Sequence, residues 1–214
     1  MQGRIEVFDG PWGKMAFVHL HNRTQFSLLD GAMRPTELVG RASELNMGAV
    51  AVTDTCNLYG AVEFYKAAKA ADIRPILGAE LWLWPEGIAN LDPRGPDGGW
   101  QIVLLVENPT GYKNLCALLT NAIFEGMHYR PRIDFTQLSA HCEGLIAMTS
   151  GLNGPLGTSC RGDLELGGNR ISQLAEILGP EHLYLELHDN GLVGQEDVCT
   201  RARTLAQTLG LSTV

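Results

Sequence analysis

The chain has 214 residues, 45% of them hydrophobic and 19% charged, which suits a globular protein with one large, well-buried domain. Its formal net charge of −8 argues against a surface built mainly to bind nucleic-acid phosphates. No apolar run approaches the roughly 20 residues of a membrane span, and five scattered cysteines without a CxxC pair favour a reducing compartment. We therefore expect a cytoplasmic protein without a membrane segment.

Apolar strands alternate with amphipathic helices along the chain. Residues 1–15 have no strong pattern and are expected to form an N-terminal extension, followed by one domain over residues 16–214. The predicted strands are Ala16–Leu20, Ala49–Thr53, Arg74–Leu83, Ile102–Val106, Leu145–Thr149 and Leu183–Leu187. Helices are predicted from Pro35 to Leu45, after N-caps at Thr110 and Asn169, and from Gln195, whereas Trp84–Gly99 is predicted as a long surface loop. This alternation predicts an α/β fold with a mostly parallel sheet, closed or open, and helices outside it.

The first predicted strand leads into a group of polar residues with metal-binding character. Strand alternation would point His19, His21 and Arg23 the same way. A histidine at position 23 would complete a transition-metal cluster, but arginine is permanently charged and offers no lone pair. Asp54 and Glu80 also adjoin the carboxyl ends of predicted strands, where α/β proteins place catalytic residues. The pattern therefore predicts a metal site that has lost a ligand.

Several motifs occur in an order that resembles one known family. They are Phe17–Ala32, Thr53-Asp54, Asn57–Tyr65, Pro75–Glu80, Thr110–Leu115, Pro131–Asp134 and Glu143–Ala147. From about Ala16 to its C-terminus, the chain resembles the N-terminal PHP (polymerase and histidinol phosphatase) domain of bacterial DNA polymerase III alpha subunits. The resemblance implies a distorted (β/α)7-type barrel, here truncated before its last strand, because the family's final Asn-Asp-x-His element would follow Val214. Members with an intact site bind several metal ions and cleave phosphoester bonds.

The resemblance also implies a set of remnant metal-site positions. They are His21, Arg23, Asp30, Asp54, Thr55, Glu80, Gln101 and Gly151. Only His21, Asp30 and Glu80 keep ligand chemistry at ligand positions, enough for weak binding of one ion at most. The positions of three histidines and a cysteine in the family hold Arg23, Thr55, Gln101 and Gly151. We therefore expect no catalytic residue and no bound cofactor in this domain.

Each of these residues also has a simpler structural interpretation. His21 could be an ordinary buried histidine, Asp30 a turn residue and Cys56 a small packing residue. The remaining histidines are interpreted as a barrel-end residue (His19) and as surface residues (His128, His141, His182 and His188). The basic residues that could contact nucleic acid or a partner, or simply form a solvated face, are Lys113, Arg130 and Arg132. Since carboxylates without metal need compensation, Arg23 is predicted to form a salt bridge with Glu80, Asp54 or Asp30.

Two functions are consistent with these observations. The resemblance favours a PHP domain of a replicative polymerase, whose full chain elongates DNA with Mg²⁺ held in a separate palm domain. Such a domain would brace the polymerase domains of the same chain and dock the proofreading exonuclease subunit within the replicase. The alternative is a metal-dependent phosphoesterase, a 3′–5′ exonuclease or a phosphatase, that uses Zn²⁺ or Mn²⁺.

Overall fold

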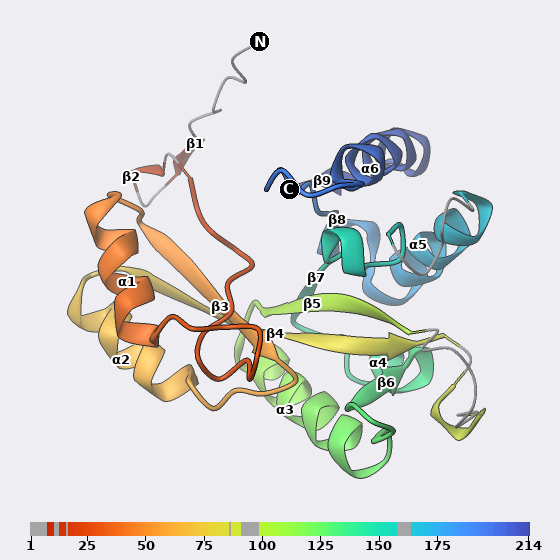
Figure 1. The fold of residues 1–214 in the computed structure, drawn as a ribbon, viewed down its shortest axis with the longest axis horizontal. Coiled ribbons are helices and arrows are strands. Elements are labelled where there is room, and N and C mark those ends of the chain that lie inside the picture. Colours follow the sequence, from red (N-terminus) through yellow and green to blue (C-terminus); the bar gives the residue numbers. More distant parts are fainter. Residues whose placement is uncertain (1–7, 11–12, 16, 86, 91–98, 158–163) are drawn as a thin grey trace. The chain divides into compact units, whose positions relative to one another are not determined.

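The protein is described here by a computed structural model that covers residues 8–10, 13–15, 17–85, 87–90, 99–157 and 164–214 (Figure 1). Its residues cluster into two compact units, an N-terminal unit (Met1–Ala79) and a C-terminal unit (Glu80–Val214). None of the helices in the described ranges combines the length and the apolar character needed to cross a bilayer.

The N-terminal unit contains two helices beside the first strands of the main sheet. Its elements are β1 (Phe8–Gly10), β2 (Gly13–Met15), α1 (Pro35–Glu44), β3 (Ala49–Thr55), α2 (Ala61–Ala70) and the first residues of β4 (Arg74–Trp84). α1 and α2 lie side by side, and α1 also packs on β3 (Figure 1). Side chains from these three elements, among them Leu38, Val52 and Phe64, form one buried apolar cluster. β1 and β2 pair antiparallel within residues 1–15, which show no strong pattern in the sequence.

Helix α1 forms where the sequence predicted it. Pro35 is its first residue, where a missing N–H and a fixed φ are compatible with a helix. The backbone N–H of Arg34 donates to the Glu37 carboxylate (2.9 Å), which satisfies one group at the helix start. The apolar side chains Leu38, Val39 and Ala42 all face the core, so one stripe of the helix is buried.

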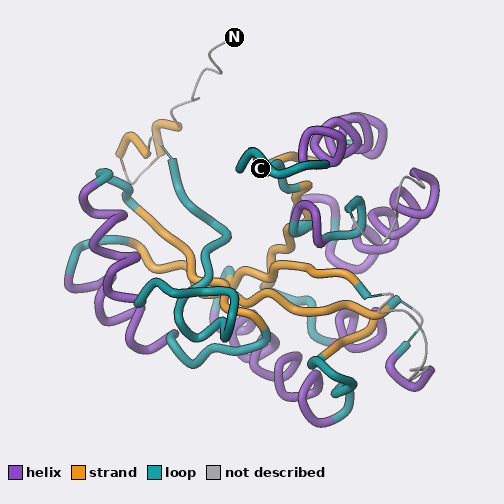
Figure 2. The backbone as a smooth tube through the Cα atoms, viewed as in Figure 1, coloured by secondary structure: helices purple, strands orange, loops and turns teal. Residues whose placement is uncertain are grey.

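The predicted strand Ala16–Leu20 is wrong for the residues that the structure describes. Residues 17–24 are irregular loop, drawn teal in Figure 2, although they run beside β3. The carbonyls of His19 and Asn22 accept hydrogen bonds from the backbone N–H groups of Ala51 (2.9 Å) and Thr53 (2.8 Å). Three residues of the segment therefore match two of β3, and this mismatch breaks a regular ladder. It also removes the strict alternation on which a common direction for His19, His21 and Arg23 depended.

The C-terminal unit holds most of the sheet, three helices of 15 or 16 residues (α3, α5 and α6) and the six-residue helix α4. After the last part of β4, its elements are η1 (Ile88–Asn90), β5 (Trp100–Val106), α3 (Pro109–Phe124), β6 (Arg132–Asp134), α4 (Phe135–Ala140), β7 (Leu145–Met148), η2 (Gly151–Asn153), α5 (Leu164–Leu178), η3 (Pro180–His182), β8 (Leu183–Leu185), α6 (Gln195–Leu209) and β9 (Ser212–Thr213). The predicted strands near β3, β4, β5, β7 and β8 are thus confirmed, with shifted ends.

The main sheet has seven strands in the order β3-β4-β5-β7-β8-β9, with β6 paired to β4. The pairs β4–β6, β7–β8 and β8–β9 are parallel, whereas β5–β7 is antiparallel. The mostly parallel α/β sheet predicted from the alternating pattern is therefore confirmed.

Two of the predicted helix caps are wrong. Asn108, not Thr110, caps α3: its side-chain oxygen accepts from the N–H groups of Thr110 and Gly111 (both 3.0 Å). Pro109 fits the first helical position, which moves the cap one residue before it. Asn169 lies inside α5, which already begins at Leu164. The predicted loop Trp84–Gly99 falls largely outside the described residues, and η1 is the part of it with regular structure.

Candidate functional site

The central polar group of the N-terminal unit is Asp54 at the end of β3. Its side chain is 2% exposed. The carboxylate accepts from the backbone N–H of Thr24 (2.6 Å) and from the hydroxyls of Thr24 (2.7 Å) and Ser27 (2.6 Å). The Ser27 hydroxyl also accepts from the backbone N–H of Thr55 (3.0 Å). Asp54 therefore links the 24–27 turn to β3. The three donated hydrogen bonds compensate much of the cost of burying the carboxylate.

Asp30 lies in a tight turn, in agreement with its interpretation as a turn residue. Its backbone N–H donates to the carbonyl of Ser27 (3.0 Å), and its side chain is exposed. Gly31 follows, and a Cβ there would lie 2.0 Å from the carbonyl oxygen of Thr24, so the turn requires glycine. His21, Arg23 and Thr55 are half-buried. The salt bridge predicted for Arg23 stays a prediction.

In the C-terminal unit, Glu80 is fully buried in β4, and the Ser150 hydroxyl donates to its carboxylate over 2.7 Å. Ser150 has a left-handed backbone (φ 53°), which is uncommon for a residue with a side chain. Gln101 lies at the beginning of β5, and the antiparallel register of β5 against β7 (Val103 opposite Met148) places this beginning opposite the end of β7. Gln101 is 4% exposed, and its Oε1 accepts no hydrogen bond from the described residues.

Gly151 follows Ser150 and lies directly against His188. Its φ is +52°, and a Cβ at this position would lie 2.5 Å from Nδ1 of His188 and 3.1 Å from Cγ and Cε1. The imidazole thus fills the space in which a side chain of residue 151 would begin.

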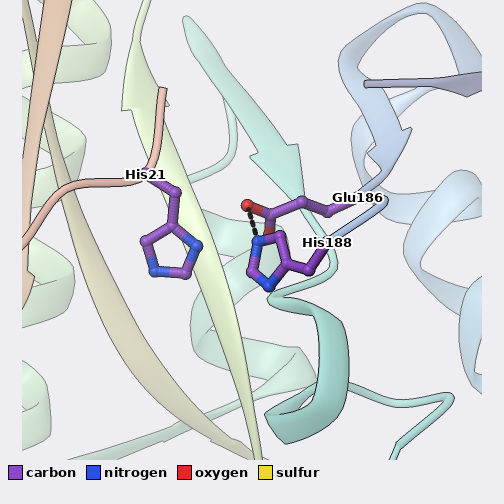
Figure 3. A group of neighbouring side chains, drawn as sticks. All are labelled: His21, Glu186 and His188. Atoms are coloured by element: carbon purple, nitrogen blue, oxygen red, sulfur yellow. Dashed lines mark hydrogen bonds and ion pairs between the residues drawn. The ribbon is translucent and has the colours of Figure 1, made fainter. Parts of the chain in front are cut away.

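His188 is held by a buried carboxylate on the same chain segment. Its Nε2 lies 2.7 Å from Oε1 of Glu186 (Figure 3). The two side chains are 26% and 7% exposed, and the backbone N–H of Glu186 donates to the Thr149 hydroxyl (3.0 Å). The Cys199 thiol donates to the His188 carbonyl (3.3 Å). Glu186 and His188 are of the residue types that bind transition metals, so the unit contains a possible glutamate–histidine ligand pair.

Sequence reasoning missed this pair. It grouped His188 with the surface histidines and did not consider Glu186. The available signal was the Glu-x-His spacing directly after the apolar strand Leu183–Leu185. In an extended segment, residues two apart point to the same side, so this spacing favours contact between the two side chains. Of the other histidines, His19 is exposed beside the Phe17 ring, and His182 lies 3.3 Å from the exposed Glu181.

The three basic residues differ in exposure. Arg132 is 2% exposed, with its guanidinium carbon 4.5 Å from the centre of the Trp84 ring. Arg130 is half-buried and stacks on Trp82 at 3.9 Å. Lys113 is exposed on α3. Contact with nucleic acid or a partner stays a prediction for all three residues.

The residues predicted to stand at the family's ligand positions would not hold a multinuclear metal centre. Gly151 has no side chain, Arg23 carries a positive charge, and Thr55 and Gln101 are weak ligands. The neighbouring Asp54 carboxylate already serves three protein donors. Among the described cysteines, Cys56, Cys116, Cys142 and Cys199, no disulfide forms. Cys56 is buried, as a packing residue would be.

Comparison with known proteins gives a consistent result. The family model for the PHP domain matches residues 19–190. The chain is 36% identical over 205 residues to DNA polymerase III subunit alpha of Treponema pallidum, and 37% identical over 206 residues to that of Thermus aquaticus. In both cases 94% of this chain aligns, but it spans only 17% of the length of the relative.

Two solved structures show the same fold at low identity. One, from Bifidobacterium adolescentis, is described as a candidate metal-dependent phosphoesterase; it has a TM-score of 0.60 at 16% identity and covers 92% of this chain and 84% of its own. The other is an amidohydrolase from Chromobacterium violaceum with bound sulfate and no metal, with a TM-score of 0.56, 15% identity and the same coverage.

Proposed function

Since the chain belongs to the PHP domain family, we propose that it is the PHP domain of a DNA polymerase III alpha subunit and has an architectural role there. One observation carries the proposal: 94% of the chain aligns with alpha subunits, yet its ligand positions include an arginine and a glycine. A domain that serves as a scaffold tolerates such losses, whereas a metal-dependent hydrolase depends on its ligand number and geometry.

Hydrogen bonds support the same conclusion within each unit. Asp54 is engaged by Thr24 and Ser27, and Glu80 by Ser150. Three protein donors engage the Asp54 carboxylate, and the Ser150 hydroxyl donates to one oxygen of Glu80. These hydrogen bonds support a structural role for both buried acids.

The proposed role implies particular partners and cofactors. The domain would pack against the polymerase domains of the same chain and dock a proofreading exonuclease subunit within the replicase, in the cytoplasm. Mg²⁺ would belong to a separate palm domain that binds DNA and deoxynucleoside triphosphates, and no cofactor is expected in the PHP domain itself. The domain would comprise residues 16–214, preceded by the extension 1–15.

The coding sequence beyond Val214 provides the first test. We expect it to continue into a polymerase region, and a stop codon shortly after Val214 would contradict the proposal. A functional test replaces the corresponding region of the Thermus aquaticus alpha subunit with this chain and measures primer extension. The chimera should synthesise DNA, whereas the same subunit with the region deleted should be inactive or insoluble. Equal synthesis with and without the region would refute an architectural role.

The alternative, a metal-dependent phosphoesterase, is favoured by the fold shared with the Bifidobacterium adolescentis protein. To test it, the purified chain is incubated with Zn²⁺ or Mn²⁺ and either a nitrophenyl phosphate ester or 3′-labelled single-stranded DNA. We expect no turnover above the protein-free control. Turnover abolished by His21→Ala but retained by His141→Ala, a second half-buried histidine, would establish the alternative.

A further inference from the structure

We propose that Gly151 and His188 are a coupled pair, in which the imidazole of His188 occupies the space of the side chain that position 151 has lost. The assignment of position 151 to a lost ligand rests on the proposed function. The coupling between the two residues rests on the structure alone. The chain would thereby have replaced a ligand position by a hydrogen-bonded glutamate–histidine pair.

His188 leaves no room for a side chain at position 151. A Cβ on Gly151 would lie 2.5 Å from Nδ1 of His188, far inside van der Waals contact. Two further ring atoms lie 3.1 Å away, so the whole edge of the imidazole faces the glycine. Any side chain at 151 therefore requires His188 to move.

His188 is also anchored by a hydrogen bond. Its other nitrogen, Nε2, is 2.7 Å from the carboxylate of Glu186, a buried residue that directly follows β8. A hydrogen bond between an imidazole and a buried carboxylate is of the stronger, charge-assisted kind when either partner is ionised. Turning the ring away from position 151 would lose this bond, so the clash cannot be relieved cheaply.

The backbone of residues 150 and 151 has an unusual conformation. Ser150 and Gly151 both have positive φ, at 53° and 52°, and the Ser150 hydroxyl donates to the buried Glu80. This turn therefore places a hydrogen-bond donor on Glu80 and a bare Cα against His188. A consequence follows for this chain: introducing a cysteine at 151 alone would not restore a ligand, because His188 must be removed as well.

A double-mutant cycle in unfolding equilibria tests the coupling. Gly151→Ala should raise the unfolding equilibrium constant roughly a hundredfold or more, through left-handed strain, the clash and the weakened Glu186–His188 bond. Gly191→Ala is the matched control: Gly191 also has positive φ (73°), but its Cβ would meet nothing within 4 Å. It should show only the strain, roughly a tenfold change. In the His188→Ala background, Gly151→Ala should cost no more than the control.

Imidazole NMR gives a readout that general destabilisation would not move. The ring resonances of His188 should shift in Gly151→Ala and stay unchanged in Gly191→Ala. If Gly151→Ala fails to fold, a folded Gly151→Ala/His188→Ala double variant supports the coupling. A double variant that fails while His188→Ala alone folds would overturn it. So would additive costs, or a Gly151→Ala cost equal to that of Gly191→Ala. Because none of these readouts involves DNA synthesis, they are independent of the polymerase proposal.

Discussion

Removing the Asp54 carboxylate should unfold the N-terminal unit far more easily, whether or not metal is present. Asp54→Ala leaves the N–H and hydroxyl of Thr24 and the hydroxyl of Ser27 without their acceptor, and Thr24 and Ser27 are at most 1% exposed. Each buried polar group that loses its partner costs about 1–3 kcal/mol, partly recovered by relaxation. We therefore expect a loss of about 3–5 kcal/mol, which corresponds to a fall in Tm of about 6–20 °C for a chain of this size.

The comparison variants separate the hydrogen bonds from the charge. In Asp54→Asn, the amide oxygen can still accept from Thr24 N–H and Ser27, while the NH₂ can donate to a reoriented Thr24 hydroxyl. We expect this variant to lose only about 1–2 kcal/mol, mainly charge assistance. Asp30→Ala is the control at another remnant position. Because Asp30 is exposed, its cost should stay within about 0.5 kcal/mol.

Urea unfolding followed by circular dichroism, with EDTA and with added Zn²⁺, checks the reasoning. The cost of Asp54→Ala should be the same in both conditions, since protein donors rather than an ion satisfy the carboxylate. A cost below about 1 kcal/mol in EDTA, or one that appears only with Zn²⁺, would refute the structural role and point to metal ligation.

Three further predictions concern the core, the Glu80 network and a tyrosine. Phe64→Ala should destabilise the N-terminal unit by about 3–5 kcal/mol in thermal unfolding, because Phe64 is fully buried; a loss under about 1 kcal/mol would contradict that core. Ser150→Ala should cost about 2 kcal/mol in urea unfolding, because buried Glu80 loses its 2.7 Å donor; an unchanged midpoint would contradict the network. The pKa of Tyr112 is raised, first by the charge of Cys116, then by burial and by a hydrogen bond to the Cys116 thiol. Cys116→Ser should therefore lower the pKa of Tyr112, measured by phenolate absorbance. The pKa of Tyr112 is higher in the folded than in the unfolded chain. Its contribution to stability is therefore complete below the unfolded pKa and is lost as the pH rises through the folded pKa.

Local patterns were sufficient to predict most regular elements. The run Ala49–Val52 is apolar throughout and forms a strand buried on both faces, because no side of it has to meet water. The stripe of Leu38, Val39 and Ala42 similarly fixed helix α1. Pattern reasoning failed where a neighbour decided the outcome. The segment after Ala16 is apolar enough for a strand, but its uneven spacing against β3 makes it irregular.

The candidate site shows the same division. Sequence motifs identified positions 21, 54, 80 and 151, and residue chemistry alone showed that arginine and glycine supply no metal ligand. No local signal revealed that Asp54 would be enclosed by Thr24 and Ser27, which lie 30 and 27 residues away. The same holds for Glu80 and Ser150, which are 70 residues apart.

The sequence by itself determined the α/β fold and the family, and it predicts the loss of ligand chemistry, because all three depend on side-chain type and order along the chain. The tertiary structure alone decided what satisfies the remaining acids and what fills the place of the lost side chain. Ser150 donates to Glu80, and His188, held by Glu186, lies against Gly151. Glu80 and Ser150 are 70 residues apart in the sequence, and only the packing of the sheet brings their atoms within hydrogen-bonding distance.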